Sequence, residues 1–505
     1  MCRIIDENGV LARTDRANWQ GALETVEQEI RRAVSFGFLE SEFRQTSAAL
    51  LSGLGSASEA AATRQSSGLA DRIVNQLSGG DVLMHPSDEL VLMERLIQQL
   101  SPKDCHDAVR QMWNTNDVRI FLSSNEPLDD DASRTILAAY ASSQQRPVAP
   151  PSDTSAHEFA YTQFGAPGKV VQRVDVSDLG IIQATFANNV RVNIKPTTFK
   201  DNAVQLSVRI GGGLLEAPMH KPGLPIVAQA TLISGGLKAH DMAELNRVLS
   251  DKVWTVSFSV LEDAFQFQGA SSTNDLETAL RVMAAYVTEP ALRPEALEQF
   301  QSRLTGLYAD LEHTPEGMLQ REVEAFTHSE DLRFGFPAQD VLRQRTLAEV
   351  QSWLERPFRE GYMEIGIVGD VDPDTALRWV AQTLGALPTR SAVKPNFARE
   401  RTVSLPTIRE PHRIRFTSET PRAATVMIWP AADGRDIHRA RRLNILSKIL
   451  NDRLRVTLRE ELGEAYTPIV LVESSETFKN YGYLASFLTV DPKKVNQVSA
   501  TVREI

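Results

Sequence analysis

The chain of 505 residues has few cysteines, no long apolar run and no excess of positive charge. Its two cysteines, Cys2 and Cys105, are too few for a disulfide scaffold and fit any compartment. No run approaches the roughly 18 apolar residues that a membrane helix needs, and residues 1–10 lack the apolar segment of a secretory signal. The net charge of −11 disfavours a nucleic-acid or anionic-membrane surface. We therefore expect a soluble globular protein whose partners include neither nucleic acid nor a membrane span.

The chain also lacks a pair of histidines close enough to bind a metal from one helix face. Its nine histidines are His85, His106, His157, His220, His240, His313, His328, His412 and His438, and no two lie within four residues of each other. A helical zinc site of the His-x-x-Glu-His or His-Glu-x-x-His kind is therefore excluded. A Gly-x-Ser-x-Gly nucleophile elbow is absent too, and the glycines at 211–213 lack the Lys-Ser/Thr of a phosphate loop. We expect these glycines to form a strand turn.

Other arrangements of metal-ligating residues are weaker. His240 and Glu244 have the spacing of one helix face, and we interpret them as a solvated pair. His313 and Glu316 flank Pro315 in an expected turn. Cys105 and His106 are neighbours that point apart on a helix, so joint ligation is not expected. The sequence therefore predicts no metal site and no catalytic residue.

An internal repeat is the strongest sign of organisation. Residues 101–113 begin with a hydroxyl residue followed by an acid three residues later, and a strand-like segment, 118–122, follows. Residues 346–358 and 363–367 repeat this pattern at an offset of 245, and both helices begin with a capping box. A further partial copy relates 260–287 to 483–505, each with a strand, an acidic turn and a helix.

The repeat divides the chain into half a unit, a whole unit and half a unit. The predicted divisions are the later part of a unit (1–146), a linker (147–180), a complete unit (181–390), a connector (391–403), and the first part of a further unit (404–505). Paired strands are expected at 190–194 and 203–210, and further strands at 413–416 and 425–429. A chain that begins and ends within a unit is expected to be a fragment. Strands followed by helices of 3.6-residue period predict an α+β fold, with an antiparallel-rich sheet covered by helices on one side.

Residues 189–192, 210–213, 369–370 and 458–466, in this order and spacing, resemble the pitrilysin/insulinase family of zinc metallopeptidases. The resemblance covers nearly the whole chain. It implies repeated pitrilysin-type units, of which this chain would hold the non-zinc, C-terminal half and part of the preceding unit. In this family zinc is held by His-x-x-Glu-His, but the corresponding positions here are Ile226, Gln229 and Ala230, which cannot ligate zinc or accept a proton. The resemblance thus implies no cofactor in this chain, and a zinc ion in a missing half or partner.

Residues 458–466, Leu-Arg-Glu-Glu-Leu-Gly-Glu-Ala-Tyr, resemble the arginine–tyrosine segment of the family's non-metal half. The resemblance carries a substrate-binding role to Arg459 and Tyr466. A guanidinium and a phenol can both donate hydrogen bonds to a peptide carbonyl and to oxyanion charge that develops at a metal. From chemistry alone, Arg459 could instead pair with nearby glutamates, and Tyr466 could be a strand aromatic.

Two functions stay open. The first is the substrate-holding half of a zinc metalloendopeptidase, which binds peptides or unfolded segments and needs a zinc-bearing half or subunit for hydrolysis. The second is a non-enzymatic scaffold subunit with the same fold. Either is compatible with several compartments, including the periplasm, and with any oligomeric state.

Overall fold

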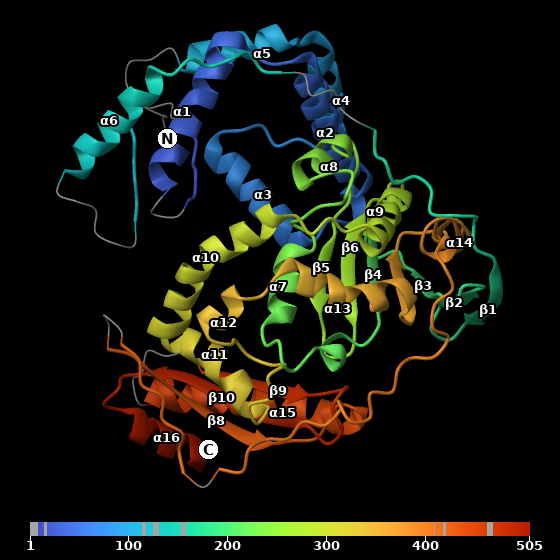
Figure 1. The fold of residues 1–505 in the computed structure, drawn as a ribbon, viewed down its shortest axis with the longest axis vertical. Helices are drawn as coiled ribbons and strands as arrows, with labels where there is room; N and C mark the ends of the chain where they lie inside the picture. Colours follow the sequence, from blue (N-terminus) through green and yellow to red (C-terminus); the bar gives the residue numbers. More distant parts are fainter. Residues whose placement is uncertain are drawn as a thin grey trace.

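The computed structural model describes residues 9–14, 18–113, 118–124, 131–152, 158–408, 410–417, 421–461 and 468–505, without the side chains of 459–461. A layer of helices lies at one end of the molecule, a large sheet with its helices in the middle, and a smaller sheet at the other end (Figure 1). None of the helices in this described part is long and apolar enough to cross a membrane.

The N-terminal region is helical. Its helices are α1 (Trp19–Phe36), α2 (Glu40–Glu59), α3 (Ser66–Gly79), α4 (Pro86–Gln99), α5 (Pro102–Trp113) and α6 (Ala132–Gln144), with a short 3-10 turn, η2 (Ala61–Thr63). The predicted start of α5 is confirmed, because the Asp104 carboxylate accepts hydrogen bonds from the backbone N–H of Ser101 at 2.8 Å and from its hydroxyl at 2.5 Å. The strand predicted at 118–122 is wrong, since these residues are irregular. A strand needs a neighbour for its backbone groups, and no strand occurs among the described residues before 170.

The central sheet has seven strands in the described part of the chain, in the order β1-β2-β3-β7-β4-β6-β5. The strands are β1 (Val170–Val176), β2 (Ile181–Phe186), β3 (Arg191–Pro196), β4 (Val204–Ile210), β5 (Ser257–Val260), β6 (Phe265–Ser271) and β7 (Met363–Gly369). Only β3 and β7 run parallel among these pairs, so the sheet is antiparallel-rich, as predicted. Strand β1 lies within the range expected to be a linker.

The expected pairing of residues 190–194 with 203–210 is wrong. Both segments form strands, but β7 lies between them, parallel to β3 and antiparallel to β4. Strand β7, the last strand of the unit along the chain, therefore lies in the middle of the sheet. Its two pairing partners come from the beginning of the unit, with β5, β6 and most of the helices in between, so local pattern could not reveal the arrangement.

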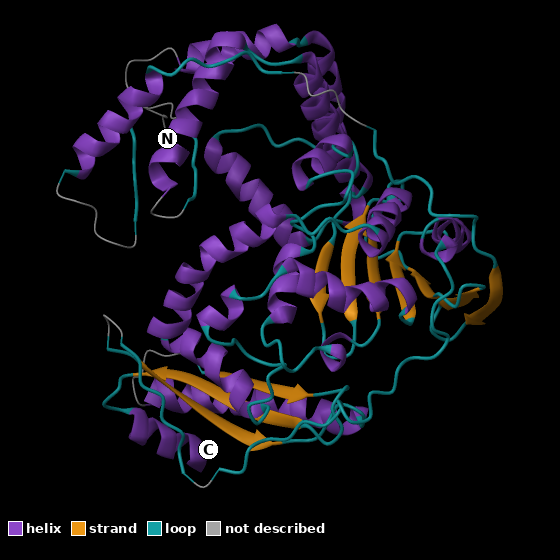
Figure 2. Cartoon of the chain, in the orientation of Figure 1, coloured by secondary structure: helices purple, strands orange, loops and turns teal. Residues whose placement is uncertain are grey.

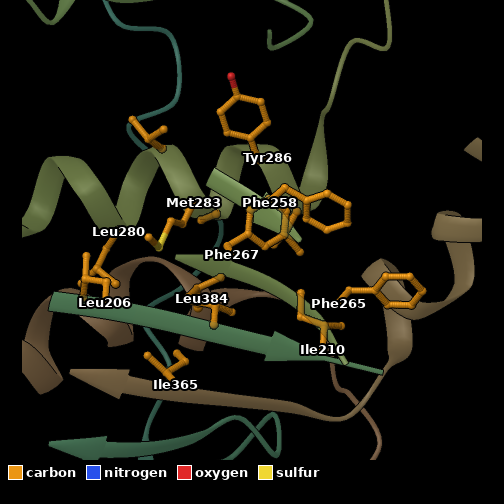
Figure 3. Close-up of a cluster of buried hydrophobic side chains, with 14 of the residues drawn as sticks. Leu206, Ile210, Phe258, Phe265, Phe267, Leu280, Met283, Tyr286, Ile365 and Leu384 are labelled. Atoms are coloured by element: carbon orange, nitrogen blue, oxygen red, sulfur yellow. The ribbon is translucent and has the colours of Figure 1, made fainter. Parts of the chain in front are cut away.

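Alternating burial explains why helices cover only one face of this sheet. Every second residue of β4 is buried, from Val204 to Ile210, and the intervening residues are polar. The buried face packs beneath the helices, and Figure 3 shows Phe258, Phe267 and Met283 interdigitating there (Figures 2 and 3). The helices of the unit are α7 (Leu224–Thr231), α8 (Met242–Val248), α9 (Leu276–Thr288), α10 (Pro294–His313), α11 (Pro315–Thr327), α12 (Gln339–Arg343), α13 (Leu347–Glu360) and α14 (Pro373–Gln382), with 3-10 turns η3 (Gly213–Glu216) and η4 (Leu384–Ala386).

The other face of the sheet carries cross-strand hydrogen bonds. Asn193 donates its amide to Glu364 at 2.9 Å and accepts from Gln183 at 3.0 Å, which links three adjacent strands. The α+β architecture with one covered face therefore follows the sequence prediction. The helix predicted at 346–358 is confirmed as α13, with a complete capping box between Thr346 and Glu349.

The C-terminal region forms a three-stranded sheet, β8-β10-β9, within the described residues. Its elements are β8 (Ala423–Pro430), α15 (Ile437–Arg455), the π-helix η5 (Val456–Glu461), β9 (Ile469–Ser474), β10 (Gly482–Val490) and α16 (Val495–Glu504). The strand expected at 425–429 is confirmed as β8, whereas the strand expected at 413–416 is wrong: those residues are irregular and pair with no strand of the described chain.

The smaller sheet repeats one part of the larger one. Val204 pairs with Ser271 in the central unit, and Ala423 pairs with Val490 here, so both partners are displaced by the same offset of 219 (423 − 204 and 490 − 271). Helices α9 and α16 begin at this offset from each other as well. The partial repeat expected from sequence is thus a repeat of β4-β6-β5 and its first covering helices.

Candidate functional site

Helix α7 occupies the place where the sequence resemblance puts a zinc motif. Gly223 precedes it with a φ of 81°, and Pro225 lies in its first turn, which together define where the helix begins. Ile226 packs against the central hydrophobic core. The side-chain oxygen of Gln229 accepts a hydrogen bond from the backbone N–H of Val260 at 3.0 Å.

The bond from Val260 gives Gln229 a structural role. Val260 belongs to β5, which ends the sheet in the described chain, and an unpaired edge N–H invites pairing with other strands. Gln229 satisfies this donor from its own unit. The zinc-motif position of α7 is therefore occupied by an isoleucine that packs against the core and by an edge-capping amide, neither of which can bind zinc or take a proton from water.

His240 is buried, so the expectation of a solvated pair with Glu244 is wrong. The ring exposes only 2% of its surface, and its Nε2 accepts a hydrogen bond from the backbone N–H of Ala160 at 3.0 Å. Phe159 stacks on it at 5.9 Å between ring centroids, while Nδ1 lies 3.5 Å from the Glu244 carboxylate. The segment that precedes β1 covers the histidine, a contact between distant parts of the chain that helical spacing could not predict.

The remaining metal candidates also bond within the protein. His313 Nδ1 lies 2.9 Å from the carbonyl oxygen of Thr417, and the Glu316 carboxylate accepts from the Thr489 hydroxyl at 3.2 Å. His106 Nε2 lies 2.9 Å from the carbonyl oxygen of Val34. Across the described part of the chain, no group of three or more histidine, cysteine, aspartate or glutamate side chains could hold a metal ion.

The three glycines after β4 form a turn, as the sequence predicts. Gly211 and Gly213 have φ values of 60° and 56°, which favour glycine. The Glu216 carboxylate accepts the backbone N–H of Gly212 at 2.5 Å, and burial raises the pKa of Glu216. A Cβ at Gly212 would clash with the Phe397 ring, so this turn is closed by protein rather than open to a phosphate.

The structure describes the frame of the arginine–tyrosine segment but not its side chains. The Arg459 backbone lies in η5, while the Arg459 side chain and the whole of Tyr466 lie outside the described residues. Leu458 is buried in the C-terminal core just before this segment. Just after it, the backbone N–H of Val470 donates to the Asn451 side-chain oxygen at 3.0 Å. Both ends of the segment are therefore anchored to α15 and β9.

The C-terminal sheet contacts the central unit through a mixed polar and aromatic junction. The Ser475 hydroxyl donates to the Glu262 carboxylate at 3.0 Å, and the Tyr481 hydroxyl donates to the carbonyl oxygen of Thr327 at 3.1 Å. His328 stacks on Phe334 with ring centroids 3.7 Å apart, and burial lowers the pKa of His328. A buried, neutral imidazole between aromatic rings suits a packing role, so this junction sets the position of the sheet that carries the candidate segment.

A cavity of about 550 Å³ lies between helix α2 and the α8–β5 region. Its lining includes Gln45, Asn246 and Trp254. Lys252, which also lines it, is already paired with Asp251 at 3.1 Å. Sequence reasoning gave no signal for this cavity, because its walls come from the N-terminal region and the central unit, which are far apart in the chain.

The chain is similar to peptidases along most of its length. Residues 345–505 match the model of the Peptidase M16 inactive domain. A zinc protease PQQL-like protein of Arabidopsis thaliana is 22% identical over 458 residues, which cover 88% of this chain and 45% of that protein. These matches support the pitrilysin/insulinase family for this chain.

Solved structures of this family share the fold. The periplasmic protease PqqL from Escherichia coli has a TM-score of 0.60 at 17% identity, over 97% of this chain and 54% of that one. The ferredoxin protease FusC, solved in complex with Arabidopsis ferredoxin, has a TM-score of 0.58 at 14% identity, over 96% and 54%. The chain thus spans about half the length of these relatives.

The pitrilysin-type inactive domain match includes the frame of Arg459, which the sequence resemblance had singled out. The match agrees with a non-catalytic half of a metallopeptidase. The roles of Arg459 and Tyr466 themselves remain predictions.

Proposed function

We propose that this chain is the substrate-holding, non-catalytic half of a zinc metalloendopeptidase that acts on peptides or unfolded protein segments. The observation that carries the proposal is the zinc-motif position in α7, where Ile226 packs against the core and Gln229 caps an edge strand. In this proposal α7 has no catalytic role, because its residues at the motif positions have structural ones. The match to the inactive domain of a peptidase family also supports a non-catalytic role for this half.

In this proposal Arg459 and Tyr466 donate hydrogen bonds to a substrate carbonyl. The described residues on either side of their segment, Leu458 and Val470, are held by the C-terminal core and by Asn451. Donors of this kind stabilise developing oxyanion charge when they are preorganised. The zinc ion that polarises the scissile carbonyl and activates water would come from a zinc-bearing half. The zinc-protease relative of Arabidopsis supports zinc as the metal.

The test combines the full chain with a zinc-bearing half of a family peptidase and measures cleavage of an unstructured fluorogenic peptide. We expect Arg459→Ala and Tyr466→Phe each to lower kcat by about 10²–10³-fold, the usual effect of removing one preorganised donor. Arg453→Ala, an exposed arginine in the last turn of α15, is the matched control and should keep full activity.

Peptide binding by the chain alone separates this function from a scaffold. Fluorescence anisotropy with the same peptide should show binding that Arg459→Ala weakens. No binding, together with unchanged activity of both variants in the combined assay, would contradict the proposal and favour the scaffold.

A further inference from the structure

A buried histidine holds the segment that joins the N-terminal region to the central unit. His240 exposes 2% of its surface, and its Nε2 accepts a hydrogen bond from the backbone N–H of Ala160 at 3.0 Å. Phe159 stacks on the ring with centroids 5.9 Å apart, and Tyr161 meets it edge-on at 6.2 Å. We call residues 158–161 the strap. The chain that comes from the N-terminal region first contacts the central hydrophobic core there.

The bond from Ala160 decides which ring nitrogen carries the proton. An imidazole nitrogen that accepts a hydrogen bond holds no hydrogen, so the neutral ring of His240 has its single proton on Nδ1. Nδ1 is buried and has no hydrogen-bond partner among the described residues, although the Glu244 carboxylate lies 3.5 Å away. The neutral ring is therefore bonded to the strap on one side and faces a carboxylate on the other.

A second proton on the ring would break the contact with the strap. An imidazolium donates from both nitrogens, so Nε2–H would point at the N–H of Ala160 and the hydrogen bond would become a repulsion. Glu244 favours the charged ring, because an opposite charge nearby stabilises it. The buried charge also lacks hydration, which an open strap would restore. The cation–π attraction of the Phe159 and Tyr161 rings is weaker than this hydration.

The other charged and titratable groups around the ring keep their charge state near neutral pH. Arg293 donates to the carbonyl oxygens of Leu237 at 2.8 Å and of His240 at 3.4 Å, and a guanidinium stays charged. Burial raises the pKa of Tyr161, and the charge of Glu289 raises it further. The charged residues next to these in the chain are exposed: Glu158, Lys238 and Asp241. Histidine alone among these side chains ordinarily changes charge between about pH 5 and pH 8.

The backbone of His240 is fixed, so the strap is the part that can move. His240 and Leu237 exchange both of their backbone hydrogen bonds, at 2.8 and 3.1 Å. We propose that His240 is a pH-sensitive switch, whose protonation releases residues 158–161 from the central unit and so lengthens the connection between the N-terminal region and β1. The inference is independent of the peptidase function.

Hydrogen exchange of the full chain, resolved to single residues by mass spectrometry, tests the proposal. As pH falls from about 8 to about 5, the protection factor of the Ala160 N–H should fall by about tenfold or more. Protection factors are corrected for the intrinsic pH dependence of exchange. The internal control is the N–H of Gly168, which donates to the carbonyl oxygen of Ala381 at 2.8 Å. Neither group of that bond titrates, so its protection should change by less than about twofold.

Three variants separate the parts of the switch. His240→Gln keeps an oxygen that can accept the Ala160 N–H but cannot be protonated in this range, so protection should persist at every pH. His240→Phe keeps an aromatic ring and removes the acceptor, so protection should be low at every pH. Glu244→Gln removes the carboxylate that favours the charged ring, and should move the midpoint of the transition to lower pH by about one unit.

Three results would overturn the proposal. The first is protection of Ala160 that stays constant with pH in the natural sequence. The second is an unchanged pH dependence in His240→Gln. The third is a loss of protection at Gly168 over the same pH range, which would indicate general unfolding. The first and third need only the natural sequence, so they decide the question even if a variant does not fold.

Discussion

Strands β6 and β10 take equivalent places in the central and C-terminal units, but Phe267 of the first corresponds to Ser486 of the second. Phe267 is fully buried, with Phe258 and Phe358 at centroid distances of 5.1 and 5.6 Å. Ser486 is also fully buried, yet its hydroxyl has no hydrogen-bond partner in the described part of the chain. Sheets of the same topology thus cover a close-packed aromatic cluster in the central unit and a smaller core in the C-terminal unit.

The turns that join the equivalent strands also differ. In the central unit, the β5–β6 turn holds Asp263, whose carboxylate pairs with Arg209 at 2.6 Å and Lys394 at 2.8 Å. In the C-terminal unit, the β9–β10 turn holds buried Phe478 and Tyr481. The two units thus keep the same strand order and backbone pairing, whereas the side chains that stabilise each unit depend on which elements cover it.

The largest expected difference concerns the two cores. Phe267→Ala should cost about 4 kcal/mol of unfolding free energy, because it opens a cavity among closely packed aromatic rings. Leu488→Ala in β10 should cost about 2 kcal/mol, since the less covered C-terminal unit can relax around the gap. Hydrogen exchange of peptides from β6 and β10 in guanidinium measures both losses. Equal losses would mean that the two cores are equally rigid.

A smaller effect should appear at the ion-paired turn. Burial opposes ionisation of Asp263, but Lys394 and the nearby arginines outweigh it and hold its pKa below the ordinary value of 3.8. A lowered carboxyl pKa contributes stability that is present above pH 3.8 and is lost as pH falls through the folded pKa. Asp263→Asn should therefore destabilise the protein by about 1–2 kcal/mol at neutral pH, and the difference should shrink below pH 3.8.

Glu216→Gln is a control for which we expect the opposite change in stability with pH. Burial raises the pKa of Glu216, so the folded state binds a proton more tightly and loses stability as pH rises above 4.5. The glutamine variant should gain stability relative to the natural sequence over that range. Denaturant midpoints for both variants, measured from acid to neutral pH, test the prediction, and parallel pH profiles would contradict it.

The smallest effect should come from the buried hydroxyl. Ser486→Ala removes a polar group that is desolvated without a hydrogen bond in the described part of the chain, and should stabilise the C-terminal unit by about 1 kcal/mol. Exchange protection of β10 should rise while that of β6 stays constant. Ser499→Ala is a matched control, because the Ser499 hydroxyl bonds to Thr425 at 3.1 Å and its loss should not stabilise.

Much of the local structure could be predicted from sequence because its causes are local. The caps of α5 and α13, the alternation in β4 and β7, and the turn after β4 each depend on residues a few positions apart. The exclusion of a helical zinc site is equally local, since it requires only the spacing of histidines.

The candidate site, too, could be predicted from sequence only where its causes are local. The spacing of residues 458–466 singled out Arg459 and Tyr466, and the structure describes only the anchors on either side, Leu458 and Val470. The burial of His240 and the edge-capping bond of Gln229 gave no sequence signal, because Ala160 and Val260 reach them from distant segments.

The sequence by itself determined the repeat, the covering of the sheet by helices on one side and the lack of a metal-binding helix, because residue spacing and side-chain chemistry set them. Only the tertiary structure decided that β7 lies between β3 and β4, that residues 118–122 form no strand, and that α15 keeps an uncovered apolar face. The physical reason is that a strand or an apolar face is stable only against a partner, and partner choice is a property of the whole chain.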